Sequence, residues 1–332
     1  MSSNLAKWAK GLTTTIIVLV SLYFFYKFRE DFYLISNVSP AIFLALSLLV
    51  ILSITLNGIK LNHITQSFNI KLRLKEWIGL AFISSCLNGF VYKSGSMLTS
   101  NYLKRKHGLP YTSFIGAMGA DHLMMILINA LVGLSASIYV LISLPEIFPL
   151  TGLFLVLLIA FSYFIRKPHA FSRKENYLLD ALCRAAQTLN DILQNKHLFQ
   201  KLFVNNIIVV LVMGLRLFIA CKTIGLDFKL LHCYLFTTVS AFIRLIPILQ
   251  SDIGSRELAV GFLSETLGSG FTQGVLATAV DRIIEMAWAL MGVTIFKNLL
   301  LILPSLHSNH SLSHHSPVDA SLYFYSLPKS HK

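Results

Sequence analysis

Charged residues are scarce in this chain. Asp, Glu, Lys and Arg together make up 13% of its 332 residues, whereas a soluble globular domain carries about 25%. Hydrophobic residues make up 55%. This composition supplies too few polar groups to cover a water-facing surface, so it excludes an ordinary soluble protein. It indicates an all-α polytopic membrane protein, with apolar stretches near the roughly 20 residues that cross a bilayer as a helix.

Motifs that would indicate redox, metal or ATP chemistry are also missing from the sequence. The four cysteines have no metal or redox spacing, so we expect inert, reduced packing residues and no cofactor. No G-x-x-x-x-G-K-[ST] loop occurs, so any transport would be passive or ion-coupled. Asp121, His122 and Asp281 supply acid–base groups, but no nucleophile elbow or metal motif accompanies them. We therefore expect no enzyme activity.

The hydrophobic pattern divides the chain into full spans and interrupted segments. Two apolar stretches, about 77–103 and 231–268, are broken by polar residues and glycines. Irregular backbone at membrane depth survives where it is buried in protein or lines a wet cavity. We expect these two to be helical hairpins that enter and return, or pairs of short, broken spans. Six further segments are long enough to span, the first as an uncleaved anchor: about 11–28, 39–58, 114–142, 149–165, 203–221 and 275–302.

The net charge of +13 is a topological signal. Lys60, Lys71, Arg73 and Lys75 form one basic loop, 104–106 another, and 166–201 the longest. Basic residues collect in cytoplasmic loops, so both termini and these three loops are expected in the cytoplasm of a multi-pass protein. No soluble basic domain is present, so no nucleic-acid binding is expected.

The polar segment 166–201 and the C-terminal tail are the two stretches outside the spans. Apolar residues recur at helical spacing in 176–200, which predicts either an amphipathic helix on the cytoplasmic face or a solvated linker helix. The tail, 305–332, is rich in His and Ser without fixed metal geometry, so disorder is predicted there. Residues 1–304 would form the membrane domain.

The membrane part contains an internal repeat. Residues 108–121 align with 268–281 at a constant offset, with four identities. The predicted halves, about 39–142 and 203–302, each read as a span, a broken hairpin, a turn and a long span. The turn is basic in the first half and carries one acidic residue in the second, so the two turns should face opposite sides. This pattern predicts an inverted repeat, as in many transporters. The aligned pairs are Gly108/Gly268, Thr112/Thr272, Ala117/Ala277 and Asp121/Asp281.

Ionisable residues cluster in the hairpins and the last span. Such residues at membrane depth are costly and usually face a cavity or each other. The functional interpretation is a polar cavity between the hairpins, in which Arg256 binds an anionic group such as a lipid phosphate. Residues after Gly254 would open a half-helix with free N–H groups facing that anion. The candidates for substrate binding are Lys93, Asp252, Gly254, Arg256, Glu257, Asp281 and Arg282.

A purely structural interpretation of the same residues stays open. Asp252 or Ser255 would cap a helix, and Glu257 would favour the helix N-terminal dipole. Arg282 and Glu285, three residues apart, would form a packing ion pair. For two further residues a structural role is favoured: Arg216 would snorkel or pair within its span, and His122 would be a satisfied buried histidine.

In the second half, "GSREL" is followed by "LG" and then by "DR" in the last span. This order of motifs resembles the membrane domain of lysylphosphatidylglycerol synthases and its stand-alone, flippase-like relatives, and it is the more specific part of the resemblance. "NGFVYKSGS" and "NYLKRKHGLPYTSF" carry it in the first half, and together it covers about 40–300. The sequence departs from the family at Ser251–Asp252, where Pro-Gly is usual, and at Ser96 and Thr99, where an acidic residue and an arginine are expected. The positions that match the family are Gly254, Arg256, Glu257, Asp281 and Arg282.

The resemblance implies a flippase-like protein of a bacterial-type plasma membrane that handles a phospholipid or lipid-linked head group, anionic, aminoacylated or glycosylated. We expect a stand-alone member without the synthase domain. Lys93, in place of a lost cation, and Arg256 would bind phosphate. Glu257, Asp252 and Asp281 would bind a cationic or hydroxyl-rich head. The alternative is a non-transporting scaffold that docks an envelope-lipid or glycan biosynthetic enzyme through the basic segment 166–201.

Overall fold

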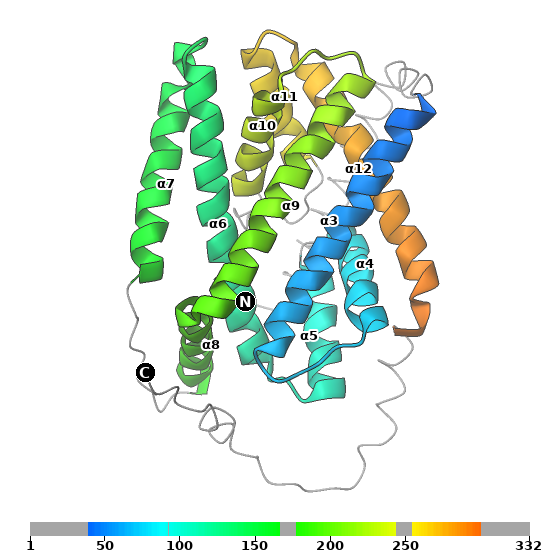
Figure 1. Cartoon of the computed structure of the whole chain (residues 1–332), viewed down its shortest axis with the longest axis vertical. Coiled ribbons are helices and arrows are strands. Elements are labelled where there is room, and N and C mark those ends of the chain that lie inside the picture. Colours follow the sequence, from blue (N-terminus) through cyan, green and yellow to red (C-terminus); the bar gives the residue numbers. More distant parts are fainter. Residues whose placement is uncertain (1–38, 92, 167–176, 244–253, 300–332) are drawn as a thin grey trace, which may run out of the picture.

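The computed structural model describes residues 39–91, 93–166, 177–243 and 254–299 (Figure 1). All regular secondary structure in these ranges is helical, which confirms the predicted all-α class. The elements, in chain order, are α3 (Pro40–Gln66), α4 (Leu74–Phe90), α5 (Ser94–His107), α6 (Tyr111–Leu141), the 3₁₀ turn η1 (Pro145–Ile147), α7 (Phe148–Arg166), α8 (Tyr177–Gln194), α9 (Lys196–Thr223), α10 (Leu230–Ile243), α11 (Ser255–Thr266) and α12 (Phe271–Ile295).

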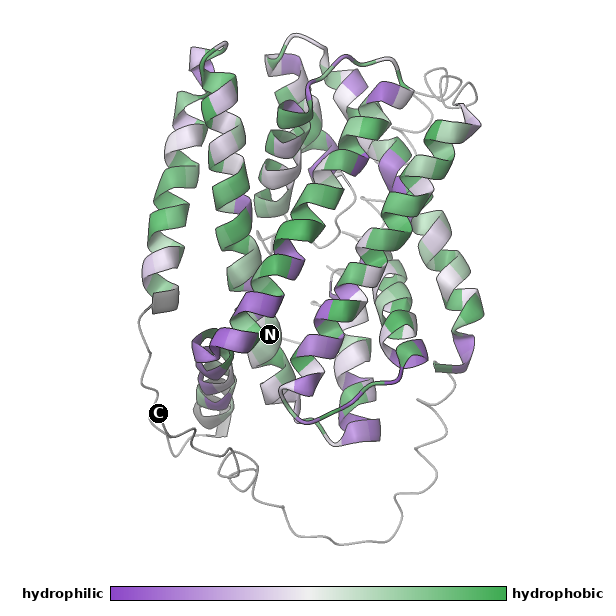
Figure 2. Cartoon of the chain, viewed as in Figure 1, coloured by the Kyte–Doolittle hydropathy of each residue, from purple (hydrophilic) through white to green (hydrophobic). Residues whose placement is uncertain are grey.

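Four of the described helical segments are long and apolar enough to cross a membrane: Pro40–Gln66, Tyr111–Leu141, Pro145–Phe164 and Lys196–Thr223. Hydrophobic residues run along most of their length in Figure 2. They cover four of the six predicted spans. Helix α12 covers most of a further predicted span, 275–302, but three charged residues lie along it and it is not among the four. The segments 11–28 and 305–332 lie outside the described residues.

Both interrupted segments are paired short helices. Helices α4 and α5 have 17 and 14 residues, and α10 has 14, all below the roughly 20 needed to span. Lys93 joins α4 to α5 in a left-handed conformation, with φ of 59°. In the second hairpin, 244–253 lies outside the described residues, and the chain resumes at Gly254 with φ of 94° before α11. A side chain at that φ would be strained, so glycine suits this turn.

The two halves of the described chain are arranged in opposite directions. In Figure 1, α3 descends and α9, packed beside it, ascends. Each is followed by a hairpin and a long helix, α6 or α12. The first hairpin lies at the lower end and the second at the upper end. Helix α4 packs on α12, and α10 packs on α6, so each hairpin contacts the long helix of the other half. An inverted repeat requires these directions.

Helix α8, within the basic segment 166–201, packs against α6. Its apolar residues Leu189, Ile192 and Leu193 join Ala117 and Met124 in one buried cluster. An amphipathic helix is therefore present, and its apolar face packs inside the protein. Its position on the cytoplasmic face stays a prediction.

Close backbone contact holds the first hairpin together. Asn88 Oδ1 accepts a hydrogen bond from the Gly95 N–H at 2.9 Å, and the Ser84 hydroxyl donates to the Gly95 carbonyl at 3.1 Å. A Cβ atom at Gly95 would lie 2.3 Å from the Ser84 carbonyl oxygen. Backbone cannot yield as a flexible side chain can, so only glycine permits this approach of α5 to α4.

Gly95→Ala should destabilise the protein by about 1–3 kcal/mol, because it forces the hairpin helices apart. Thermal unfolding in detergent measures the effect. Gly152→Ala is the matched control, since a Cβ there would have no neighbour within 4 Å, and it should unfold near the wild-type temperature. Equal unfolding temperatures for Gly95→Ala and wild type would show that the helices are not in this contact.

A polar cluster anchors the other end of the hairpin, outside the candidate spans. Glu76, in the first turn of α4, accepts hydrogen bonds from Tyr102 at 2.9 Å and from the Arg73 N–H at 2.7 Å, and it pairs with Lys106. Burial by itself raises the pKa of Glu76, but the bonds from Lys106, Arg73 and Tyr102 outweigh it and lower this pKa to about 2. The ionised carboxylate therefore ties α4 to α5.

The Glu76 contribution to stability should depend on pH. Because its folded pKa lies below the ordinary value of 4.5, the contribution is complete above about pH 4.5 and is lost as the pH falls toward about 2. Glu76→Gln should therefore unfold at a lower temperature than wild type at neutral pH, and the difference should shrink as pH decreases from about 6 to about 3. A difference that stays constant over this range would contradict the assigned ionisation.

Candidate functional site

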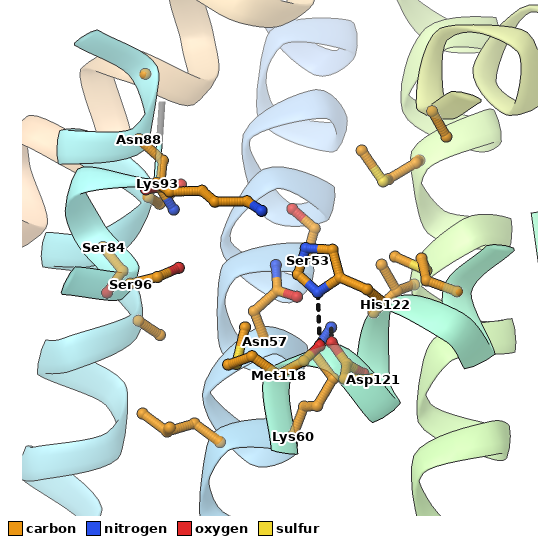
Figure 3. A pocket seen from close by; sticks show the side chains of 18 of the residues that line it. Ser53, Asn57, Lys60, Ser84, Asn88, Lys93, Ser96, Met118, Asp121 and His122 are labelled. Atoms are coloured by element: carbon orange, nitrogen blue, oxygen red, sulfur yellow. Dashed lines mark hydrogen bonds and ion pairs between the residues drawn. The ribbon is translucent and has the colours of Figure 1, made fainter. Parts of the chain in front are cut away.

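A cavity of about 390 Å³ lies between the two halves and is lined from α3, both hairpins, α6, α9 and α12. Asn57, Lys93, Ser96 and His122 point toward its centre (Figure 3). Among the described residues, its wall carries five basic side chains and two carboxylates. The basic residues are Lys60, Lys93, Arg216, Arg256 and Arg282, and the carboxylates are Asp121 and Glu285.

Asp121, on α6, is held by two residues from other helices. Lys60 of α3 pairs with it at 2.9 Å (Nζ to Oδ2), and Asn206 of α9 donates to its Oδ1 at 2.9 Å. Lys60 also donates to the Asn206 amide oxygen at 3.3 Å, which closes a triangle of buried side chains. His122, the next residue, hydrogen-bonds the Met118 carbonyl at 2.7 Å through Nδ1 and presents its ring to the cavity. The predicted hydrogen-bonded histidine is thus observed, although its side chain is half-buried and not fully buried.

Asp281, on α12, is fully buried between two arginines. Arg216 of α9 forms a bidentate pair with it, at 2.9 and 3.0 Å. Arg256 of α11 donates to Asp281 Oδ2 at 2.7 Å. Arg216 also donates to Glu285 at 2.7 Å and to the Ser53 hydroxyl at 2.8 Å, so it bonds three other residues. Of the two predicted roles of Arg216, snorkelling and pairing, the structure shows pairing, with Asp281 and Glu285.

The two aspartates aligned by the repeat have matching surroundings. Asp121 pairs with a cation from the first helix of its own half, Lys60 of α3, and Asp281 pairs with Arg216 of α9. A polar side chain from the first helix of the other half joins each cluster: Asn206 donates to Asp121, and Ser53 accepts from Arg216. Asp281 also pairs with Arg256 of α11. These contacts agree with the predicted inverted repeat.

An ion pair between Glu257 and Arg282 lies at the start of α11. The Gly254 N–H donates to Glu257 Oε2 at 2.8 Å, and Arg282 donates to Glu257 Oε1 at 2.6 Å. Glu257 thus satisfies an otherwise free N–H at the helix start, as its structural interpretation predicts. Because Arg282 reaches across to it, α11 is fixed to α12.

The structure brings the predicted site residues into one region but gives them different surroundings. Lys93, Arg256 and Arg282 line the cavity. Glu257 and Asp281 are the acidic partners of the two arginines and are not among the lining residues. Gly254 forms the turn before α11, and Asp252 lies outside the described residues.

One prediction about position was wrong. Lys60 was assigned to a basic loop, but α3 continues to Gln66 and Lys60 is 9% exposed inside the bundle. The observed ion pairs of Arg282 and Glu285 join other helices: Arg282 contacts Glu257 of α11, and Glu285 contacts Arg216 of α9.

Sequence reasoning missed the polar face of α3. Ser53, Asn57 and Lys60 are spaced four and three apart, which places them on one side of a helix. All three line the cavity. This spacing within an apolar segment is the signal that would have identified them.

The fold and site define an integral, all-α membrane protein with a polar central cavity and buried ion clusters. The chain belongs to the family described as the lysylphosphatidylglycerol synthase TM region, whose model matches residues 11–293. No curated protein and no solved structure gave a significant match. The family links the protein to membrane lipid metabolism or transport.

Asp281→Asn should destabilise the protein by about 3–5 kcal/mol, because it removes the buried carboxylate that pairs with both Arg216 and Arg256. Glu265→Gln, at an exposed position of α11, is the control and should behave as wild type. Thermal unfolding of the purified proteins in one detergent compares them. An Asp281→Asn protein as stable as wild type would show that the network does not support the fold.

Proposed function

We propose that this protein binds the anionic head group of a lipid in its central cavity and moves the lipid, or helps to move it, across a bacterial plasma membrane. The observation that carries the proposal is a cation-lined cavity formed jointly by two oppositely directed halves. Membership of a lipid-linked membrane family supports the substrate class. The termini and basic loops would face the cytoplasm, as the positive-inside rule predicts.

The walls of the cavity suit a phosphate. Lys93 reaches into it from the start of α5, and Arg256 and Arg282 line it from the second half. Guanidinium and ammonium groups form short, charge-assisted hydrogen bonds with phosphate oxygens. Those bonds strengthen where the protein excludes water. Carboxylate partners already hold the two arginines in fixed positions, so little ordering would be needed on binding.

The tip of the first hairpin suits the rest of a lipid. Phe90, Val91 and Met97 are 55%, 59% and 73% exposed and flank Lys93 along the chain. In a bilayer these side chains would contact acyl chains while the ammonium of Lys93 contacts the head group. This neighbourhood of apolar and cationic groups distinguishes a lipid site from a site for a small, fully water-soluble anion.

The inverted arrangement suits movement between the two membrane surfaces. In transporters built from such repeats, substrate binds where broken helices meet, and one unit rocks against the other. Here the hairpins, together with α3, α6, α9 and α12, surround the cavity. Movement without an ATP-binding loop would follow the lipid gradient or couple to an ion.

The scaffold alternative remains a second proposal. A docked biosynthetic enzyme would bind the polar face of the segment 166–201, since the apolar face of α8 is packed on α6. A scaffold needs no occupied cavity, so cavity variants distinguish the two functions.

Lys93→Asn tests the proposal with little risk to the fold, because asparagine tolerates the left-handed backbone found there. Lys75→Asn, exposed at the start of the same hairpin, removes the same charge away from the cavity. Native mass spectrometry would measure phosphatidylglycerol bound to each purified protein, and reconstituted liposomes would measure its transbilayer movement. Lys93→Asn should weaken binding and slow movement about tenfold, as expected for one charged hydrogen bond, while Lys75→Asn matches wild type. Equal binding and movement in all three proteins would leave the scaffold as the better hypothesis.

A further inference from the structure

His122 is the one histidine among the described residues that line the cavity. Its side chain is half-buried on α6, and the ring points toward the centre of the cavity (Figure 3). Imidazole is the side chain that ordinarily changes charge between about pH 5 and pH 8. Free carboxylates titrate near pH 4, and amines and guanidinium groups above about pH 10. His122 is therefore the group of the described wall suited to bind and release a proton near neutral pH.

One hydrogen bond decides where the neutral ring carries its hydrogen. Nδ1 lies 2.7 Å from the Met118 carbonyl oxygen, one turn earlier on α6. A carbonyl can only accept, so this bond assigns the hydrogen to Nδ1 and leaves the lone pair on Nε2. The hydrogen bonds of the described residues include none to Nε2. The neutral ring thus offers an acceptor at Nε2, whereas a protonated ring offers a donor.

Nε2 lies on the side of the ring that faces Lys93. In Figure 3 this nitrogen is turned away from Met118 and toward the ammonium of Lys93, which acts on the ring electrostatically. A phosphate oxygen held by Lys93 would therefore lie on the Nε2 side of the ring. A protonated Nε2 can donate to such an oxygen, whereas the lone pair of a neutral Nε2 repels it.

The charged groups around the ring come from several helices. Besides Lys93, they include Asp121 beside it on α6 and Lys60 of α3. Helices α7, α8 and α10 also pack on α6, but their described residues place no charge in this wall. The other charged residues of the described wall are Arg216 of α9, Arg256 of α11, and Arg282 and Glu285 of α12. An anion among these cations favours a proton on the ring, because opposite charges within about 4–6 Å stabilise each other.

A metal ion is poorly suited to the same role. Transporters coordinate coupling ions such as Na⁺ with oxygen ligands. Both carboxylates of the described wall already bind basic side chains, Asp121 binding Lys60 and Glu285 binding Arg216. The basic residues also outnumber the carboxylates, and like charges repel a metal cation. The cavity therefore favours a proton over a metal ion.

We infer that His122 is the proton-binding group that couples lipid movement to a proton gradient. The inference rests on the proposed function, in which the ligand is a lipid phosphate. A proton from water on one side of the membrane binds Nε2, and the imidazolium donates to a phosphate oxygen. After the lipid leaves on the other side, the proton returns to water there. One lipid anion and one proton together carry no net charge across the membrane.

Coupling follows from the reciprocity of the two binding events. If protonation of His122 tightens lipid binding by some factor, lipid binding tightens proton binding by the same factor. A hydrogen bond to a charged group changes affinity about tenfold. The phosphodiester of phosphatidylglycerol keeps its negative charge throughout the range in which imidazole titrates. A pH dependence of binding in that range therefore arises in the protein.

The pH dependence of lipid binding tests the assignment. Microscale thermophoresis of the full-length protein in detergent would measure the dissociation constant for short-chain phosphatidylglycerol from about pH 8 to about pH 5.5. Wild type should bind about tenfold more tightly at the acidic end. His122→Gln, which cannot titrate, should bind weakly throughout, and His122→Lys, which keeps a charged donor, should bind tightly throughout. His232→Gln, at a half-buried position outside the cavity wall, should keep the wild-type pH dependence.

Reconstituted liposomes separate coupling from recognition. A pH gradient, acidic outside, should make wild type accumulate phosphatidylglycerol in the inner leaflet relative to protein-free liposomes. A protonophore should abolish this accumulation. His122→Gln should show no accumulation with or without the gradient, while His232→Gln should match wild type.

Three results would overturn the inference and leave the proposed function standing. The first is equal wild-type binding across the pH range. The second is a His122→Gln protein that keeps the wild-type pH dependence, which would place the proton elsewhere. The third is wild-type movement that ignores the gradient, which would make it passive. Failure of phosphatidylglycerol to bind at every pH, with Lys93→Asn no different from wild type, would instead refute the proposed function itself.

Discussion

Two carboxylates inside an apolar bundle constrain the rest of this structure. Moving a charge from water into a low-dielectric interior costs several kcal/mol per ion unless partners of opposite charge and good geometry surround it. Asp281, with no exposed surface, meets this requirement through Arg216 and Arg256. Asp121 meets it through Lys60 and Asn206. Since the partners come from different helices, satisfying the charges fixes how α3, α6, α9, α11 and α12 lie against one another.

The broken helices and the cavity follow from the same constraint. If each hairpin were one continuous helix, its polar side chains would be spread along the whole helix. The turn instead places the start of a short helix, with its polar groups, at the cavity. The left-handed residue Lys93 and the positive φ of Gly254 produce these turns. The ion clusters around Asp121 and Asp281 add further polar groups near these turns. A cavity is left in which the protein supplies the hydrogen bonds that lipid tails cannot.

The order of elements could be predicted from the sequence because it depends on local composition. The interrupted apolar runs predicted both hairpins, and the alignment of Asp121 with Asp281 predicted the related positions of α6 and α12. Which charged residues pair with one another could not be predicted, because the partners are far apart in the sequence. Arg216 and Asp281 are 65 residues apart, and Lys60 and Asn206 are 146 apart. Lys60 was also misplaced because the apolar run ends before it, although the helix does not.

The charged residues of α12 affect how membrane spans are recognised from the sequence of such a protein. The three residues, Asp281, Arg282 and Glu285, form ion pairs with the neighbouring helices, and Arg282 and Glu285 line the cavity. The same three residues make the helix too polar to resemble a membrane span by composition. A hydropathy criterion that limits the number of charged residues therefore passes over a helix whose charges are paired inside the bundle. For this architecture such a criterion counts fewer membrane-embedded helices than the fold contains.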